Sequence, residues 1–394
     1  MPEKFQLLSD TVYPYVIEYY RHLHAHPELS FQEFETSKFI QHQLISMDIP
    51  FRIGIGGTGV VGKISGKNPG KKTIALRADM DALPIQEEVN LPWKSQQENV
   101  MHACGHDAHT ACLLGAAKIL NELKSNFEGT ILLIFQPGEE KAPGGASLML
   151  QDGVFDELIP DIVIGQHVSE DYPTGSLAFR QGIVMASADE IHLTIRGKGG
   201  HGAKPHLCND TVLAAAQTVV SLQQVRSRLC PPLTPMVLTF GKLIADGATN
   251  VIPGEVKLSG TFRTFDEHWR TEAKKHITRI IRDTCSAYGC TVDIDMPAGY
   301  PCLVNNAEIT EKSRYFAAAL IDEKNILEFD QRLTSEDFSF FSQLYPACFY
   351  RFGIKGNSNR NAGRSHSSTF CIDEKSLQTG TSGLAWIALG FLND

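Results

Sequence analysis

The sequence has no excess of positive charge. Its 36 Lys and Arg residues are outnumbered by 45 Asp and Glu residues, which gives a formal net charge of −9 at pH 7. A protein that binds nucleic acid needs a basic face, and no run of Lys and Arg is present to provide one or to attract an anionic membrane surface. We therefore expect neither nucleic acid nor membrane among its partners.

Long hydrophobic runs and a disulfide framework are also missing. No stretch approaches the roughly 18 apolar residues of a membrane span. The N-terminal segment has acidic residues early and no apolar core of the signal-peptide type. The nine cysteines are an odd number without framework spacing, which is typical of cytosolic thiols. With 42% apolar and 21% charged residues, the composition predicts a soluble, globular, cytoplasmic protein.

The hydrophobic pattern of the first half predicts an α/β domain. A chain of 394 residues favours two domains over one. Near-continuous apolar segments, expected to be strands, alternate with helical patterns. Such alternation predicts a mostly parallel mixed sheet covered by helices on both faces. The expected strands are 72–79, 129–136 and 161–167, and the expected helices are about 5–24, 29–47 and 107–124.

The pattern changes near residue 184. Residues 189–197 alternate apolar and polar positions, as a half-exposed antiparallel strand does. The following segments give the order β-α-β-β-α-β, which predicts a ferredoxin-like α+β unit. We expect an inserted lid or dimerisation domain at 184–298, between the two parts, 1–183 and 299–394, of a catalytic metal-binding domain. The second part should add a strand at 347–353 and three helices. These are expected at 307–321, immediately after a capping Ser335, and at about 374–391.

Residues that bind metals gather at one edge of this predicted sheet. The segment MHACGHDAHT (101–110) holds one thiol and three imidazoles in ten positions. In open α/β sheets, ligands bind beyond the carboxyl ends of the strands. Several candidates fall at strand ends or in the loop that opens a helix: Asp79, Asp81, Cys104, His106, Glu139, Glu140 and His167.

The mixture of donors favours a transition metal. Thiolate, imidazole and carboxylate ligands suit Zn, Mn, Co or Ni better than Mg or Ca. Two adjacent carboxylates allow one to bind metal while the other takes a proton from water, as hydrolysis requires. A Cys104 nucleophile with one oriented histidine is an alternative, but it leaves the Glu139–Glu140 pair without a role.

Some of these residues also have simpler interpretations. An adjacent glutamate pair in a loop is usually solvated. Asp107 fits the N-cap of the helix at 107–124. The alternating histidines of residues 22–26 can interact with a helix dipole and are interpreted as structural. His102 and His109 could each orient a ligand or simply pack.

The chain resembles the dinuclear-metal amidohydrolases and peptidases that include aminoacylase, hippurate hydrolase and the plant auxin-conjugate hydrolases. The resemblance covers essentially the whole chain, in long motifs that follow the expected order. These are RHLHAHPELSFQE (21–33), LRADMDALPIQE (76–87), MHACGHDAHT (101–110), FQPGEE (135–140), GQHV (165–168), GKGGHGAKPH (197–206), TNVIP (249–253), SEDFSFF (335–341) and SHSSTF (365–370).

The resemblance implies a complete metal site. Two divalent ions about 3.5–4 Å apart would share a bridging water that attacks the amide carbonyl. Glu139 would act as general base, and Asp81 would orient or tune a ligand. The wider family has His-x-Asp where this chain has Asp79-Met80-Asp81, and a cysteine enters the ligand set instead, as in the aminoacylase-like branch. The implied ligands are Cys104, His106, Glu140, His167 and His366.

The resemblance also gives the inserted domain a role. GKGGHGAKPH resembles the segment that, in related dimers, places a histidine in the partner's active site to stabilise the tetrahedral oxyanion. His201 is the first candidate and His206 the second, although either could be a turn histidine. Asn250 and Arg263 resemble groups that hold the substrate carboxylate, for which arginine has bidentate geometry. A structural salt bridge is the alternative for Arg263.

Together these features predict an enzyme that cleaves N-acyl-L-amino acids, with acetyl, benzoyl or similar acyl groups, to a carboxylate and a free amino acid. A homodimer or higher homo-oligomer is expected. A dipeptidase or carboxypeptidase with the same metals is the nearest alternative. A catalytically silent metal- or ligand-binding relative is another, but such a protein needs no base such as Glu139 beside the ligand Glu140.

Overall fold

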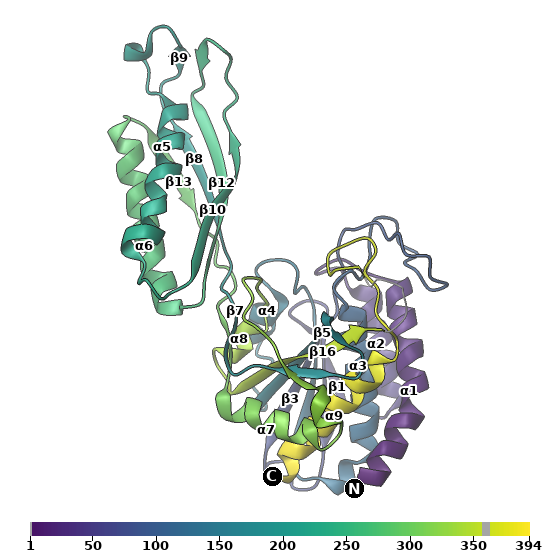
Figure 1. The fold of residues 1–394 in the computed structure, drawn as a ribbon. Helices are drawn as coiled ribbons and strands as arrows, with labels where there is room; N and C mark the ends of the chain where they lie inside the picture. Colours follow the sequence, from purple (N-terminus) through teal and green to yellow (C-terminus); the bar gives the residue numbers. More distant parts are fainter. Residues whose placement is uncertain (1, 357–362) are drawn as a thin grey trace. The chain divides into compact units, whose positions relative to one another are not determined.

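The computed structural model describes residues 2–356 and 363–394 (Figure 1). The chain forms two compact units, which we describe separately. The first comprises Met1–Val184, Val304–Asp330 and Asp337–Asp394, and the second comprises Met185–Leu303 and Gln331–Glu336. That the second unit folds as an independent inserted domain stays a prediction.

The first unit is built on an eight-stranded mixed sheet in the order β1-β2-β4-β3-β5-β16-β6-β15. The four neighbours β4, β3, β5 and β16 run parallel, while β1, β2 and β6 pair antiparallel with their neighbours nearer the centre of the sheet. The predicted mostly parallel mixed sheet is therefore confirmed. The strands are β1 (Phe51–Ile55), β2 (Gly59–Ser65), β3 (Thr73–Asp79), β4 (Thr130–Gln136), β5 (Ile162–Pro173), β6 (Leu177–Phe179), β15 (Ile326–Glu328) and β16 (Ala347–Lys355).

Helices cover both faces of this sheet, because its central strands are apolar on both sides. Ile131, Leu133 and Phe135 of β4 join the core beneath three long helices, while Leu132 and Ile134 are buried on the opposite face. Helices α1, α3 and α9 pack on one another, and α4 and α8 contact each other and the sheet (Figure 1). The helices are α1 (Pro2–Ala25), α2 (Phe34–Ser46), α3 (His106–Glu122), α4 (Gly145–Gln151), α7 (Ala307–Ala318), α8 (Ser339–Ser342) and α9 (Ser376–Asn393).

The helix expected after a capping Ser335 is wrong as predicted. Helix α8 has only four residues, and its N-cap position is Phe338, which makes no side-chain cap. The Ser335 hydroxyl instead accepts a hydrogen bond from Arg263 at 3.0 Å. Asp337 is held by a buried arginine of β3 (Arg77 NH2 to Asp337 Oδ1, 2.8 Å), so tertiary contacts override the local helix signal.

The second unit is a four-stranded antiparallel sheet in the order β10-β12-β8-β13. Its core includes Leu193, Ala214 and Ile277, which come from the sheet and from both helices. The element order β-α-β-β-α-β is the expected ferredoxin-like arrangement. The main elements are β8 (Asp189–Arg196), α5 (Thr211–Gln224), β10 (Met236–Ile244), β12 (Glu255–Thr264), α6 (Glu267–Ala287) and β13 (Thr291–Asp295).

Short elements complete the two units. The strands are β7 (Gly182–Met185), which pairs with β14 (Leu303–Asn305), and β9 (Gly200–His201), which pairs with β11 (Val251–Ile252). The short helical turns are η1 (Lys124–Asn126), η2 (Pro205–Leu207), η3 (Val225–Leu229) and η4 (Glu323–Asn325). Among residues 2–356 and 363–394, no helix combines the length and hydropathy that crossing a membrane requires.

Candidate metal centre

The histidine-rich loop enters α3 through a left-handed glycine. Gly105 has φ +85°, and a Cβ there would lie 2.6 Å from Cγ2 of Val168, so this position needs glycine. The helix then begins at His106. This tight entry brings Cys104 and His106 beside β5, which carries His167.

Asp107 is not the N-cap of α3, contrary to expectation. Gly105 occupies that position, and Asp107 lies in the first turn of the helix. Its Oδ2 lies 2.7 Å from Nδ1 of the buried His24, whose Nε2 is 3.2 Å from Glu87 Oε1. Burial alone would lower the pKa of His24, but the two carboxylates raise it to about 9.

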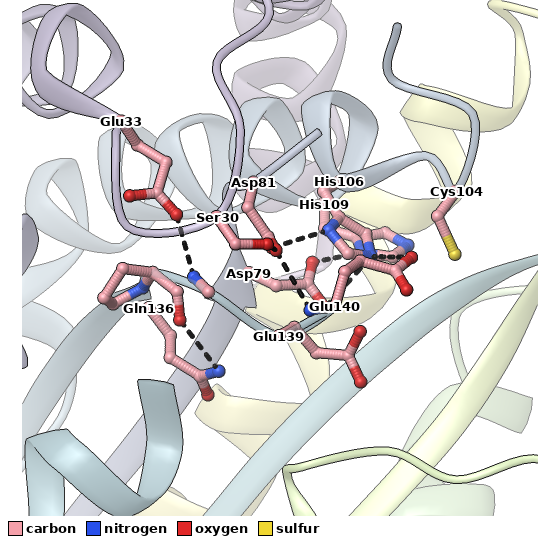
Figure 2. A network of polar contacts seen from close by, with 12 residues as sticks. Ser30, Glu33, Asp79, Asp81, Cys104, His106, His109, Gln136, Glu139 and Glu140 are labelled. Atoms are coloured by element: carbon pink, nitrogen blue, oxygen red, sulfur yellow. Dashed lines mark hydrogen bonds and ion pairs between the residues drawn. The ribbon is translucent and has the colours of Figure 1, made fainter. Parts of the chain in front are cut away.

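The structure brings all the predicted ligands and the predicted base together in one cluster. Three overlapping groups each have their ligand atoms within 4.8 Å of one another. We call their members the Cys–His–Glu cluster; Figure 2 shows four of them together with their polar partners. The groups are Cys104 with His106 and His167, Cys104 with Glu140 and His366, and His106 with Glu139 and Glu140.

His106 is oriented as a metal ligand would be. Its Nδ1 faces Asp81 Oδ1 at 3.1 Å, and because a carboxylate only accepts, Nδ1 carries the proton. Nε2 is buried and has no hydrogen-bond partner among the described residues. A buried polar atom left unpaired costs about 1–3 kcal/mol, so the position fits a cation. Burial opposes protonation of His106, but Asp79, Cys104 and Asp81 raise its pKa well above the usual value.

His167 presents a lone pair to the cluster. Its Nδ1 donates to the Val168 carbonyl at 2.8 Å, which leaves Nε2 unprotonated and 3.5 Å from Cys104 Sγ. Burial, with Arg351 and His109 nearby, lowers the pKa of His167 well below its usual value. The ring is therefore neutral, which is the form that binds metals.

The two histidines that the sequence left undecided differ from these ligands. His109 uses both ring nitrogens: Nδ1 donates to Asp79 Oδ1 at 2.6 Å, and Nε2 accepts from the Val168 N–H at 2.9 Å. It therefore positions Asp79 and β5. His102 is buried, and burial lowers its pKa to about 4.

A buried arginine behind the cluster was not predicted. Arg77 lies in the middle of β3 and is 1% exposed. Its guanidinium contacts Asp79 Oδ2 at 2.7 Å, Gln136 Oε1 at 2.8 Å and Asp337 Oδ1 at 2.8 Å. An arginine within the apolar run TIALRAD is the signal that could have found this network, because a buried charge requires partners.

The turn after β4 carries the glutamate pair. Glu139 is 6% exposed, and its Oε1 accepts a hydrogen bond from the Asp337 N–H at 3.3 Å. The Glu140 N–H donates to Asp81 Oδ2 at 3.0 Å, so Asp81 contacts both His106 and this turn (Figure 2). The simpler interpretation of a solvated glutamate pair does not fit, because Glu139 is buried and the Glu140 side chain is only 13% exposed.

His366 reaches the cluster from a loop near the C-terminus. It has φ +65°, and its N–H donates to the Ala103 carbonyl at 2.8 Å. Its Nε2 lies 3.0 Å from Glu140 Oε1, and hydrogen bonds to Cys104 and Glu140 raise its pKa to about 10. The residue pattern alone did not reveal His366, since a lone histidine in a serine-rich loop carries no signal; only the resemblance implied it.

The remaining candidates lie in the second unit. His201 Nδ1 accepts from the Ala203 N–H at 3.0 Å, and His206 belongs to η2. The Asn250 carbonyl accepts from the Gly202 N–H at 2.8 Å. Arg263 makes no ion pair within the described part of the chain, and its Nε donates to Thr261 Oγ1 at 3.2 Å. The roles of these residues stay predictions.

The fold and the cluster define a class of protein. Thiol, imidazole and carboxylate groups gathered at the strand ends of an open sheet are typical of metallopeptidase-like hydrolases. The chain belongs to peptidase family M20/M25/M40, whose model matches residues 75–389. It is accordingly an amide hydrolase, and the resemblance found in the sequence is confirmed.

Individual relatives cover nearly the whole chain. Thermostable carboxypeptidase 1 of Saccharolobus solfataricus is 38% identical over 382 residues, 96% of each chain. The N-acyl-L-amino acid amidohydrolase of Geobacillus stearothermophilus is 43% identical over 306 residues, 78% of this chain and 82% of the relative. Among solved structures, the Bacillus subtilis YXEP protein, described as a dinuclear metal binding peptidase from the M20 family, has a TM-score of 0.83 at 32% identity and covers 98% of this chain and 99% of its own.

Proposed function

We propose that the protein is a metal-dependent amidohydrolase that cleaves N-acyl-L-amino acids to a carboxylate and a free amino acid. The overlap of the three ligand groups is the observation that carries this proposal: Cys104, His106 and Glu140 each belong to two of them. Shared ligands suit two neighbouring cations. The Geobacillus relative is named for this reaction.

The donor set fits divalent Zn, Mn, Co or Ni. Cys104, His106, Glu140, His167 and His366 would hold two such ions. When bound, these cations supply Lewis-acid polarisation of the scissile carbonyl and lower the pKa of water towards about 7.

The chain's own residues then perform the proton transfers. Glu139 accepts the proton that water loses as it attacks the amide carbonyl, and passes it to the leaving nitrogen as the C–N bond breaks. The Asp337 N–H holds the carboxylate of Glu139, and Asp81 holds His106 in the tautomer that a ligand needs.

The second unit supplies substrate contacts in this proposal. His201, with His206 as the alternative, donates to the oxyanion of a partner's active site, which requires a homodimer or higher homo-oligomer. Asn250 and Arg263 hold the carboxylate of the substrate's amino acid. The absence of an ion pair to Arg263 among the described residues supports this role, since its charge is available. We also propose a cytoplasmic location.

A peptidase activity is the second candidate, because the Saccharolobus relative is named a carboxypeptidase. Both reactions release an amino acid with a free carboxylate. A substrate panel separates them: N-acetyl, N-benzoyl and indole-acetyl amino acids against dipeptides and longer peptides.

The test is activity on this panel after chelator treatment, followed by resupply of Mn, Zn, Co or Ni. We expect hydrolysis of acyl amino acids to vanish with the metal and return with it. Turnover of peptides alone would favour the second candidate. Activity that survives chelation but not thiol alkylation would indicate a Cys104 nucleophile, and metal binding without turnover on any substrate would indicate a silent relative.

A further inference from the structure

The turn that carries Glu139 is held on both sides by carboxylates. The Gly138 N–H donates to Glu33 Oε1 at 2.8 Å, and the Glu140 N–H donates to Asp81 Oδ2 at 3.0 Å (Figure 2). These are the residues immediately before and after Glu139. Two carboxylates therefore fix the backbone from which the Glu139 side chain leaves.

Glu33 is a fully buried carboxyl group whose partners in the described structure are all hydrogen-bond donors, and burial raises its pKa. It is 0% exposed and forms no ion pair with any described residue. Three donors surround it: the Phe31 N–H at 2.9 Å, the Thr58 hydroxyl at 2.7 Å and the Gly138 N–H. A carboxyl group buried without a cation depends on its hydrogen bonds, so Glu33 and its three donors hold one another in fixed positions.

The same N-terminal segment supports the other side of the turn. The Ser30 hydroxyl donates to Asp81 Oδ2 at 2.6 Å, the oxygen that also accepts from the Glu140 N–H. Gly138 has φ +58°, and a Cβ there would overlap the ring of Phe31. Residues 30–33 thus lie directly against the turn, although more than one hundred positions separate Glu33 from Gly138 in sequence.

We propose that Glu33 is a positioning residue for Glu139. It acts through the Gly138 peptide and sets the direction of the carboxylate that takes the proton. This inference rests on the proposed function, in which Glu139 is the base. A base displaced by about 1 Å can lose on the order of 100-fold in rate, so the effect is measurable.

The test compares variants at Glu33 with a matched control, using purified, metal-loaded protein and the panel substrate that the wild type cleaves fastest. Glu33→Met removes the acceptor, and Glu33→Asp keeps the carboxyl group but draws it away from Gly138. Glu33→Gln keeps Oε1 for both N–H donors and can donate to Thr58. Thr58→Val removes one hydrogen bond from the same carboxylate without touching the turn.

We expect kcat to fall about 100-fold in Glu33→Met, with KM and metal content unchanged. If the methionine variant does not fold, Glu33→Asp should show a clear fall in kcat in its place. Glu33→Gln should restore kcat to within about tenfold of the wild type, and Thr58→Val should lower thermal stability with kcat near normal. A merely structural role would make all variants less stable and leave kcat per folded molecule unchanged, which would overturn the proposal. So would a glutamine variant as slow as the methionine one.

Glu139→Gln, measured in parallel, separates this inference from the proposed function. Full turnover by Glu139→Gln would show that Glu139 is not the base, and it would overturn the positioning role of Glu33 as well. If Glu139→Gln loses turnover while Glu33→Met and Glu33→Asp both have normal kcat, the assignment of Glu139 as base stands and only the role of Glu33 is overturned.

Discussion

Glu139 and Glu140 are neighbours in sequence, but their side chains have different surroundings. Oε1 of Glu140 lies 3.0 Å from Nε2 of His366 and within 4.0 Å of Nε2 of His106, among the other ligand atoms. Glu139 belongs to one of the same ligand groups, but its Oε1 also accepts a hydrogen bond from the Asp337 N–H. In the proposed function, Glu140 binds metal and Glu139 takes the proton from water.

Substitution should separate these two tasks. We expect Glu139→Gln to keep its metal and to lose about 10²–10⁴-fold in kcat, because general base catalysis is worth that much. Glu140→Ala should lose bound metal, and therefore activity, because two ligand groups share this carboxylate. Metal content by elemental analysis and kcat on the same preparations check both statements. Normal turnover in both variants would show that the assignment is wrong.

His24 should make stability depend on pH. Its pKa rises from 6.5 to about 9 in the folded chain because Asp107 and Glu87 flank the buried ring. A raised folded-state pKa contributes stability that is fully present below about pH 6.5 and is lost as the pH rises through about 9. At roughly 1.4 kcal/mol per pKa unit, the loss over this range is about 3 kcal/mol.

Denaturant unfolding of the wild type and of His24→Gln, from pH 6 to pH 9.5, measures this contribution. The difference in free energy of unfolding between them should shrink as the pH rises. His26→Gln is the matched control, because His26 is exposed and contacts the carbonyl and ring of His22 but no carboxylate in the described structure. A constant difference between wild type and His24→Gln would show that folding does not raise the pKa of His24.

At the scale of elements, α1, α3 and α9 approach so closely that a glycine is required. A Cβ on Gly115 of α3 would overlap Val16 of α1 and lie 2.8 Å from Cγ2 of Thr381 of α9. Alanine is normally the better helix former by about 1 kcal/mol. Here we expect Gly115→Ala to destabilise by about 1–3 kcal/mol, because overpacking outweighs propensity.

Thermal unfolding checks this prediction, with Gly383→Ala of α9 as the control. The nearest atom to a Cβ at Gly383 is the flexible end of Leu177 at 3.1 Å, so that variant should be near neutral. Equal effects in the two variants would mean that the helices can move apart at Gly115 without cost.

The sequence was sufficient for elements whose signal is local. The apolar runs at 72–79 and 129–136 became β3 and β4, because a strand buried on both faces has that pattern. The prediction of a helix after Ser335 was wrong because Asp337 accepts a hydrogen bond from Arg77, which is far away in sequence. Local capping signals cannot anticipate such a contact.

The same distinction holds within the site. The positions of the candidate ligands that end strands or open α3 could be predicted, because topology alone brings them to one edge. His366 could not, since its place depends on a left-handed backbone and on a hydrogen bond to Ala103. The role of His109 depends equally on two partners, Asp79 and Val168, that only the folded chain reveals.

At the scale of the whole molecule, the two units have separate hydrophobic cores. Leu113 and Ile164 belong to the core of the first unit, while Leu193 and Ile277 belong to that of the second. Every residue of the Cys–His–Glu cluster lies in the first unit. Metal binding should therefore stabilise the first unit directly and make no direct contribution to the stability of the second.

Calorimetry with and without metal tests this consequence. We expect two unfolding transitions, of which only one shifts to higher temperature when chelator-treated protein receives Mn or Zn. A ligand that binds only the folded state adds about 2.7 kcal/mol at one hundred times its dissociation constant, which is readily detected. Glu140→Ala is the control, because it lacks a shared ligand and its transitions should not respond to the same metal. Equal shifts of both transitions in the wild type would mean that the two units unfold as one cooperative body, and no shift at all would contradict the metal centre itself.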